Sequence, residues 1–144
     1  MNEARHLGVY GLIVDDNKIA LILKSRGAYT GKLDLPGGSI EHGERPEETL
    51  VREIKEELNA DVKEYNLFDS ESVTVNWKHK EQDENMHHIG IFYLVTLKDN
   101  KLKEDADGLD SLGAKWYDID KLKKDDVSPL TWIELNKLLN NKTK

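Results

Sequence analysis

Short apolar runs alternate with polar, glycine-containing segments in the first part of the chain. Two such runs, at 8–14 and 19–23, are separated by the turn-forming sequence DDNK, and this pattern predicts a β-hairpin. A basic, glycine-containing loop over 24–32 and a brief extended piece over 33–35 follow. The Pro-Gly-Gly sequence at 36–38 is expected to stop regular structure at that point.

The pattern of the remaining chain predicts two helices with strands between them. Residues 46–58 have a helical pattern in which Pro46 suits the first turn, and the sequence Ser-Pro at 128–129 starts a terminal helix. Between the helices, the pattern predicts strand character over 62–75 in one or two strands, a polar loop over 76–87, a strand over 89–97, a loop over 98–113 and a short strand over 114–117. This order of elements predicts an α+β fold, with a mixed β-sheet that has helices packed against it.

Composition and charge change this picture mainly by exclusion. A chain of 144 residues has the length of one domain, which we place at 1–144. It has no cysteine, which excludes a disulfide framework, a thiolate metal site and a cysteine nucleophile. The net charge of −7 argues against partners such as nucleic acid polymers and anionic membranes. We expect a cytoplasmic protein, because the first residues do not resemble a signal peptide and no apolar run is long enough to span a bilayer.

The candidate chemistry is concentrated in the helix predicted over 46–58. At about 100° per residue, Glu53, Glu56 and Glu57 fall within about 100° of one another on one face of this helix. An apolar stripe lies beside them and can be buried against a sheet. Arg52 flanks the three glutamates and is placed to brace one carboxylate through a bidentate pair. The helix therefore combines a buried face with an acidic one.

Carboxylates at this spacing repel one another, so three of them beside a buried face call for a compensating cation. Mg²⁺ is the natural choice, because it prefers oxygen ligands and binds carboxylates together with substrate phosphates. The competing interpretation is a solvated acidic helix face, which is the better one for any Glu-x-x-Glu-Glu sequence taken alone.

The spacing between this helix and the residues before it favours the metal site. Five residues separate Gly38 from Glu44, and seven more separate Glu44 from the sequence REIKEE at 52–57. This arrangement resembles the Nudix box of the Nudix hydrolase family, Gly-x5-Glu-x7-Arg-Glu-aliphatic-x-Glu-Glu-x-Gly-aliphatic. Two positions depart from that pattern, since Asn59 replaces the glycine and Ala60 is small for the aliphatic position. Asparagine is the next most tolerant residue for a left-handed helix end, so we expect catalysis to survive.

The resemblance implies a Nudix fold, in which a mixed β-sheet is sandwiched between α-helices. It also implies a MutT-like activity: hydrolysis of a nucleoside diphosphate linked to another moiety, by water attack at phosphorus, with Mg²⁺ or Mn²⁺. The implied metal ligands all offer an oxygen atom, and they are Glu53, Glu56, Glu57 and the carbonyl of Gly37. Either Glu53 or Glu56 would orient or deprotonate the attacking water. Arg52 would hold a glutamate in place, and Glu44 would act behind the metal ligands. The number of metal ions is left open.

The candidate substrate-binding residues are Lys24, Arg26, Gly38 and Trp77. The two basic side chains could contact phosphates and the tryptophan could stack on a base. Each has a plainer interpretation, because basic loop residues are more often only solvated and an aromatic residue near a strand end at least as often only packs.

Five further residues outside the box have side chains that can bind metals. Asp107 and Asp110 could add a distal metal ligand, although a solvated charge run is the better-supported interpretation. His79, His87 and His88 show no zinc spacing, so structural or surface roles are expected for them.

Several substrates fit this resemblance, and the sequence does not choose among them. They are nucleoside triphosphates, ADP-ribose or other nucleotide-sugars, and dinucleoside polyphosphates. RNA 5′ ends fit poorly with the acidic charge. A second class of function is a non-hydrolytic nucleotide-binding module with a signalling role, but such modules usually lose the box carboxylates. An isomerase of isopentenyl diphosphate requires a cysteine that this chain lacks. The expected partner is a small nucleotide-type molecule, and whether the chain forms a homodimer is left open.

Overall fold

The structure is a computed structural model, and it describes residues 2–102 and 111–142. Its central feature is a mixed sheet of seven strands, with β3-β2-β1-β6-β5 in order, β4 paired with β1 and β7 paired with β2. The strands are β1 (Asn2–Asp15), β2 (Lys18–Lys24), β3 (Leu33–Asp34), β4 (Gly37–Ser39), β5 (Val62–His79), β6 (Gln82–Leu97) and β7 (Ser111–Asp118). Strands β1 and β6 are parallel and the other pairs are antiparallel, which confirms the mixed sheet.

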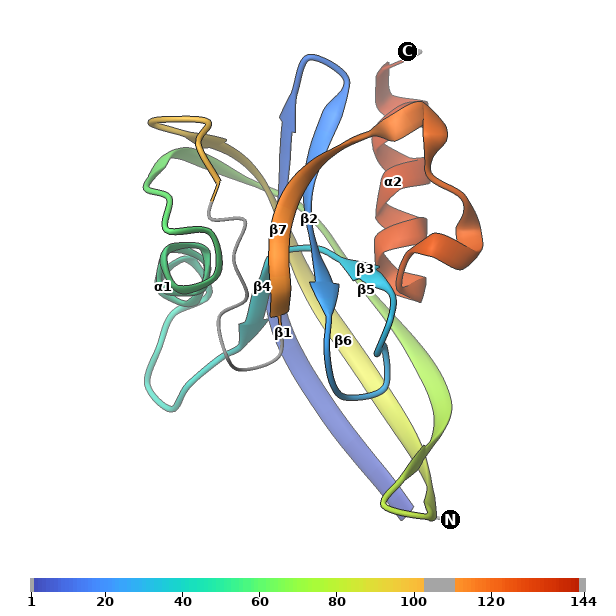
Figure 1. Cartoon of the computed structure of the whole chain (residues 1–144). Coiled ribbons are helices and arrows are strands. Elements are labelled where there is room, and N and C mark those ends of the chain that lie inside the picture. The colour runs from blue at the N-terminus through green and yellow to red at the C-terminus, as the bar shows by residue number, and fades with distance from the viewer. Residues whose placement is uncertain (1, 103–110, 143–144) are drawn as a thin grey trace.

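Two α-helices cover opposite faces of this sheet (Figure 1), so the expected sandwich of a sheet between helices is confirmed. Helix α1 (Pro46–Leu58) packs on one face, and α2 (Pro129–Lys142) packs on the other after two short 3₁₀ turns, η1 (Ile119–Lys121) and η2 (Lys124–Asp126). Each helix covers a separate hydrophobic core, and neighbouring residues of β1 belong to different cores because successive side chains of a strand point to opposite faces. Ile13 joins the core beneath α1, and Leu12 joins the core beneath α2.

Helix α1 matches its predicted bounds, and its ends explain why. At the start, Pro46 occupies the first turn and the Glu48 carboxylate accepts the backbone N–H of Arg45 at 2.9 Å. At the end, Asn59 takes the left-handed conformation (φ 52°, ψ 39°), as expected for the residue that replaces glycine. Ala60 is buried in the core beneath α1, so the small side chain at this position is packed and leaves the helix end intact.

Two expectations about strands were wrong. Residues 36–38 do not stop regular structure, since Gly37 and Gly38 pair with Tyr10 and Val9 of β1 as part of β4. The polar loop expected over 76–87 is instead the tip of the β5–β6 hairpin, with left-handed Lys80 and Glu81 in its turn. The composition misled because the hairpin tip is polar and largely exposed, and cross-strand pairing rather than apolar content holds it.

The remaining strands are longer than their apolar runs. Strand β1 begins at Asn2 because it pairs in parallel with β6 from Asn2–Glu84 to Ile13–Val95, and strand character over 62–75 belongs to a single strand, β5. Strand β7 begins at Ser111, and residues 103–110 of the loop expected before it lie outside the described residues. Neither α1 nor α2, the two α-helices of the described residues, is long and apolar enough to cross a membrane.

Candidate active site

Arg52 gathers the acidic side chains of the box around one guanidinium group. Its Nε and Nη2 donate to the two carboxylate oxygens of Glu44 at 2.7 and 2.9 Å, which is a bidentate pair. Its Nη1 donates to Glu53 at 3.0 Å and lies 3.4 Å from both oxygens of Glu56. A fourth carboxylate, that of Glu41, is 3.7 Å away. The rigid fork of the arginine therefore fixes several carboxylates relative to one another.

Glu44 is held in its charged form by these contacts. The bond from Arg52 is the main cause that lowers the pKa of Glu44 to about 2, and the backbone N–H of Glu41 and the hydroxyl of Thr49 contribute further hydrogen bonds. These donors occupy both oxygens of Glu44, so this residue anchors Arg52 and through it Glu53.

We name residues 36–38, at the start of β4, the glycine loop, and this segment contacts two of the glutamates of α1. Gly37 has φ 145°, and a Cβ there would run into the β1 backbone at Val9 and Tyr10. Its N–H donates to the carboxylate of buried Glu57 at 2.7 Å. A Cβ at Gly38 would lie 2.7 Å from the Glu53 carboxyl carbon. Glycine is therefore required at position 37 for the loop to lie against β1, and a side chain at position 38 would displace the Glu53 carboxylate.

The chemistry of this donor set fits a hard divalent cation. Glu53, Glu56 and Glu57 offer oxygen atoms from one region of α1, and they contact either the glycine loop or Arg52. Over residues 2–102 and 111–142, no three acidic or histidine side chains already stand close enough to hold a metal ion. The positive charge inside the cluster is that of Arg52, and Glu56 has the most exposed carboxylate of the three, at 56%.

A cavity of about 680 Å³ extends from this cluster across the sheet. Gly37, Gly38 and Glu53 form one part of its lining, and the predicted substrate-binding residues Lys24, Arg26 and Trp77 line the same cavity. Trp77 lies on β5 rather than in a loop, and its ring stacks on His79 with centroids 4.9 Å apart. The indole N–H donates to Glu84 at 3.1 Å, which fixes the ring. The structure thus brings every predicted substrate-binding residue together with Glu53.

The remaining predicted residues lie at the side of this cavity or beyond the described chain. Glu44, Arg52, Glu56 and Glu57 do not line it, and they adjoin it through Glu53 and the glycine loop. The two distal acids, Asp107 and Asp110, lie outside the described residues.

Three buried polar residues of the lining were not predicted as substrate-binding residues from the sequence. Tyr10, Tyr29 and His88 are buried beside the cavity, and His88 bonds to both tyrosine hydroxyls. They come from β1, the loop after β2, and β6, so no local motif signals them. A structural or surface role was expected for His88, and its side chain is buried, at 1% exposed, which excludes the surface role.

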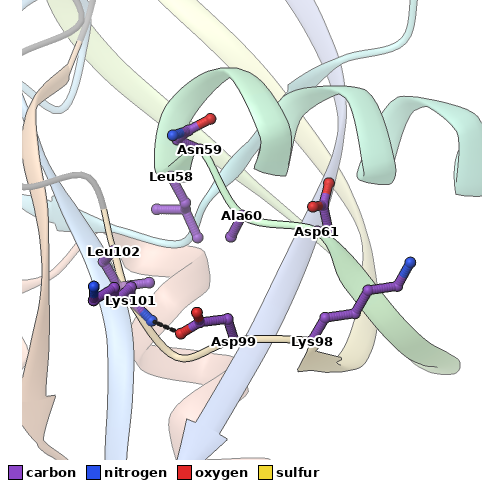
Figure 2. A pocket seen from close by; sticks show the side chains of 8 residues that line it. All are labelled: Leu58, Asn59, Ala60, Asp61, Lys98, Asp99, Lys101 and Leu102. Carbon is purple, nitrogen blue, oxygen red and sulfur yellow. Dashed lines mark hydrogen bonds between the residues drawn. The ribbon is translucent and has the colours of Figure 1, made fainter.

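A second cavity, of about 430 Å³, lies at the C-terminal end of α1 (Figure 2). Its lining includes Leu58, Asn59 and Lys98, and an Asp99 carboxylate that accepts the backbone N–H of Lys101 at 3.0 Å. None of the predicted site residues lines it. The larger cavity is therefore the candidate active site.

Comparisons with known proteins identify the family of this chain. A family model described as the NUDIX domain matches residues 4–137. The chain is 35% identical over 118 residues to a protein of Methanocaldococcus jannaschii named ADP-ribose pyrophosphatase, covering 82% of this chain and 64% of that protein. It is 38% identical over 56 residues to the 8-oxo-dGTP diphosphatase of Escherichia coli, covering 38% of this chain and 43% of that protein.

The fold agrees as well. The crystal structure of a MutT NUDIX hydrolase from Burkholderia pseudomallei superposes with a TM-score of 0.71 at 25% identity, over 92% of this chain and 96% of that one. The family match spans both helices up to residue 137 and every strand that lines the cavity. On these grounds, the chain belongs to the Nudix family.

Proposed function

We propose that this chain is a metal-dependent pyrophosphohydrolase that cleaves a nucleoside diphosphate linked to another moiety, with ADP-ribose as its substrate. The observation that carries the proposal is the single cavity that joins Glu53 and the glycine loop to Lys24, Arg26 and Trp77. Such a cavity offers carboxylates and backbone at one end, cations for phosphate oxygens, and an aromatic surface for a base.

The choice of ADP-ribose over a nucleoside triphosphate follows from how far each likeness extends. The relative named ADP-ribose pyrophosphatase aligns with 82% of this chain, whereas the Escherichia coli relative named 8-oxo-dGTP diphosphatase aligns with 38%. Substrate choice depends on residues spread over β1, β2, β5 and β6 rather than on the box alone. The more extensive likeness is therefore the better guide.

In this proposal, the three glutamates of α1 and the Gly37 carbonyl hold Mg²⁺, or Mn²⁺ in its place. A divalent ion at such a site supplies positive charge beside the diphosphate oxygens and makes a water more acidic. Glu53 lines the cavity whereas Glu56 does not, so Glu53 is the better placed to accept the proton of the attacking water. Arg52, anchored by Glu44, keeps the Glu53 carboxylate against Gly38.

The reaction adds one water across the phosphoanhydride bond, so ADP-ribose gives AMP and ribose 5-phosphate. The test is a hydrolysis assay with Mg²⁺ or chelator, in which products of ADP-ribose, 8-oxo-dGTP, a dinucleoside polyphosphate and triphosphorylated RNA are identified by mass. Glu53→Gln and Glu56→Gln should each reduce turnover by roughly 10²- to 10⁴-fold without unfolding the chain. Glu48→Gln, an exposed glutamate on the same helix, is the matched control and should keep the parent rate.

The outcomes separate the alternatives. Equal rates in the parent and in both glutamate variants would show that the cluster is not catalytic. Cleavage of 8-oxo-dGTP but not ADP-ribose would keep the hydrolase and change its substrate. Binding of ADP-ribose with no turnover in Mg²⁺ would point to a non-hydrolytic module.

A further inference from the structure

A hydrogen-bonded unit of three side chains is built into the cavity beside the candidate catalytic cluster. The Tyr10 hydroxyl is 2.6 Å from Nε2 of His88, and the Tyr29 hydroxyl is 2.7 Å from Nδ1 of the same ring. Tyr10, Tyr29 and His88 are 4%, 7% and 1% exposed, respectively, and all three line the cavity. His6, which also lines the cavity, stacks on His88 with ring centroids 4.8 Å apart. We name Tyr10, His88 and Tyr29 the Tyr-His-Tyr unit.

The protonation state of the Tyr-His-Tyr unit is set by burial. Burial, with smaller contributions from the charges of His6 and Lys24, lowers the pKa of His88 to about 3, so its ring is neutral in physiological conditions. Burial also raises the pKa of both tyrosines, so each keeps its hydroxyl hydrogen. The unit therefore carries three polar hydrogens, one on each tyrosine oxygen and one on the imidazole.

Two contacts can use only two of these three hydrogens. If His88 carries its hydrogen on Nδ1, it donates to Tyr29, Tyr10 donates to Nε2, and the Tyr29 hydrogen is left over. If the hydrogen is on Nε2, the roles reverse and the Tyr10 hydrogen is left over. In either tautomer, the unit has one O–H available to an acceptor in the cavity, and a tautomer change moves that donor from one tyrosine to the other.

The unit lies between the two ends of the cavity. Tyr10 pairs with Gly37 of the glycine loop. His6, four residues before Tyr10 in β1, pairs with His88 of β6. Glu84, four residues before His88 in β6, pairs with Trp77 of β5. Residues four apart in a strand share a face and are separated by roughly 13 Å. The order along the sheet is glycine loop, Tyr-His-Tyr unit and Trp77–His79 stack, which matches the order diphosphate, ribose and base in a nucleotide.

We propose that the Tyr-His-Tyr unit is a specificity-determining element that donates one neutral hydrogen bond to a ribose hydroxyl oxygen of the bound nucleotide. This rests on the proposed function for the ligand, but not on turnover. Because either tyrosine can supply the donor, the unit can donate its hydrogen bond to the 2′ or to the 3′ oxygen. A ligand that offers no acceptor binds less tightly, because the buried tyrosine hydroxyl is then left without a hydrogen-bond partner.

The test measures binding of ADP-ribose by calorimetry in chelator, where hydrolysis does not contribute. Tyr10→Phe and Tyr29→Phe should each weaken binding by less than about 3-fold, because the remaining tyrosine takes over as donor. The double variant should weaken it by roughly 10-fold, more than the product of the single effects. Tyr65→Phe is the matched control, since Tyr65 is an exposed tyrosine outside the cavity lining.

Deoxy ligands separate a direct donor from a structural role. An ADP-ribose analogue that lacks both the 2′ and the 3′ hydroxyl of the adenosine should bind the parent less well, because it offers the unit no acceptor, whereas the double variant should bind this analogue and ADP-ribose alike. Equal weakening for all ligands, or additive single effects, would overturn the inference while leaving the hydrolase intact. Failure of the parent chain to bind ADP-ribose would overturn the inference together with the choice of substrate, whereas hydrolysis of other nucleotides would still be measurable.

Discussion

The structure contains two clusters in which one basic side chain meets several carboxyl groups, and they lie with α1 and α2 on opposite faces of the sheet. In the first, Arg52 contacts Glu44, Glu53 and Glu56. In the second, Lys137 bonds to Asp69 at 2.7 Å and to Glu71 at 2.9 Å. The two clusters are similar in composition, and they differ in how many acids the cation reaches.

The consequence is seen at Glu134 in the second cluster. Glu134 is fully buried, and among the described residues neither of its oxygens has a hydrogen-bond partner. The neighbouring group that acts most strongly on Glu134 is the Asp69 carboxyl. Burial first, and Asp69 second, raise the pKa of Glu134 to about 8, so this acid is neutral at pH 7. The forked guanidinium of Arg52 keeps Glu44 charged in the first cluster, whereas the compact ammonium of Lys137 leaves Glu134 protonated in the second.

Exchanging the two cations is the strongest way to test this comparison. Arg52→Lys should reduce kcat by roughly 10- to 100-fold, because a single ammonium cannot hold Glu44 in a bidentate pair and also fix Glu53. The reverse exchange, Lys137→Arg, is the matched control and should leave turnover near the parent value. Steady-state kinetics with Mg²⁺ titration checks both variants, and parental activity of Arg52→Lys would refute the role given to the guanidinium.

A smaller effect is expected from removing the titration of Glu134. The pKa of Glu134 in the folded state, about 8, is above its ordinary value of 4.5. Between pH 4.5 and pH 8, the folded state therefore keeps a proton that the unfolded state has already released. The free energy of unfolding should therefore fall as pH rises from about 4.5 to about 8. Glu134→Gln should remove that dependence and raise stability at pH 8.5 by about 1–3 kcal/mol.

Urea unfolding at pH 5 and pH 8.5 measures this effect. At pH 5 the variant and the parent should differ little, because the parent acid is then neutral. Glu71→Gln, at the exposed side of the same cluster, controls for the loss of a carboxylate that is already charged. If the parent did not lose stability relative to Glu134→Gln between pH 5 and pH 8.5, Glu134 would not be a buried neutral acid.

The smallest effect concerns repulsion within the first cluster. The sequence alone predicts that removing one of the three glutamates slightly raises stability without metal. Because Arg52 already lies 3.4 Å from Glu56, the repulsion is largely offset, and Glu56→Gln should change the free energy of unfolding in chelator by less than about 0.5 kcal/mol. Thermal melts in chelator measure this, and a large stabilisation would mean that Arg52 does not offset the charge.

The sequence determined the features that depend on neighbouring residues. The bounds of α1, the turn between β1 and β2, and the left-handed Asn59 follow from side chains a few positions apart. The Nudix box is likewise a local spacing, so the residues at the candidate catalytic cluster could be named before any contact was seen. Helical periodicity alone was enough to place three glutamates on one face of a helix.

Only the tertiary structure decided which distant residues meet. The polar tip of the β5–β6 hairpin has no apolar signal, and its strands form because each residue has a partner across the hairpin. The Tyr-His-Tyr unit joins residues 59 and 78 positions apart, and the buried Glu134 lies near an acid on another element. A periodic pattern tells which face of a strand is buried but not which strand lies beside it, and that choice is made by the packing of the whole sheet.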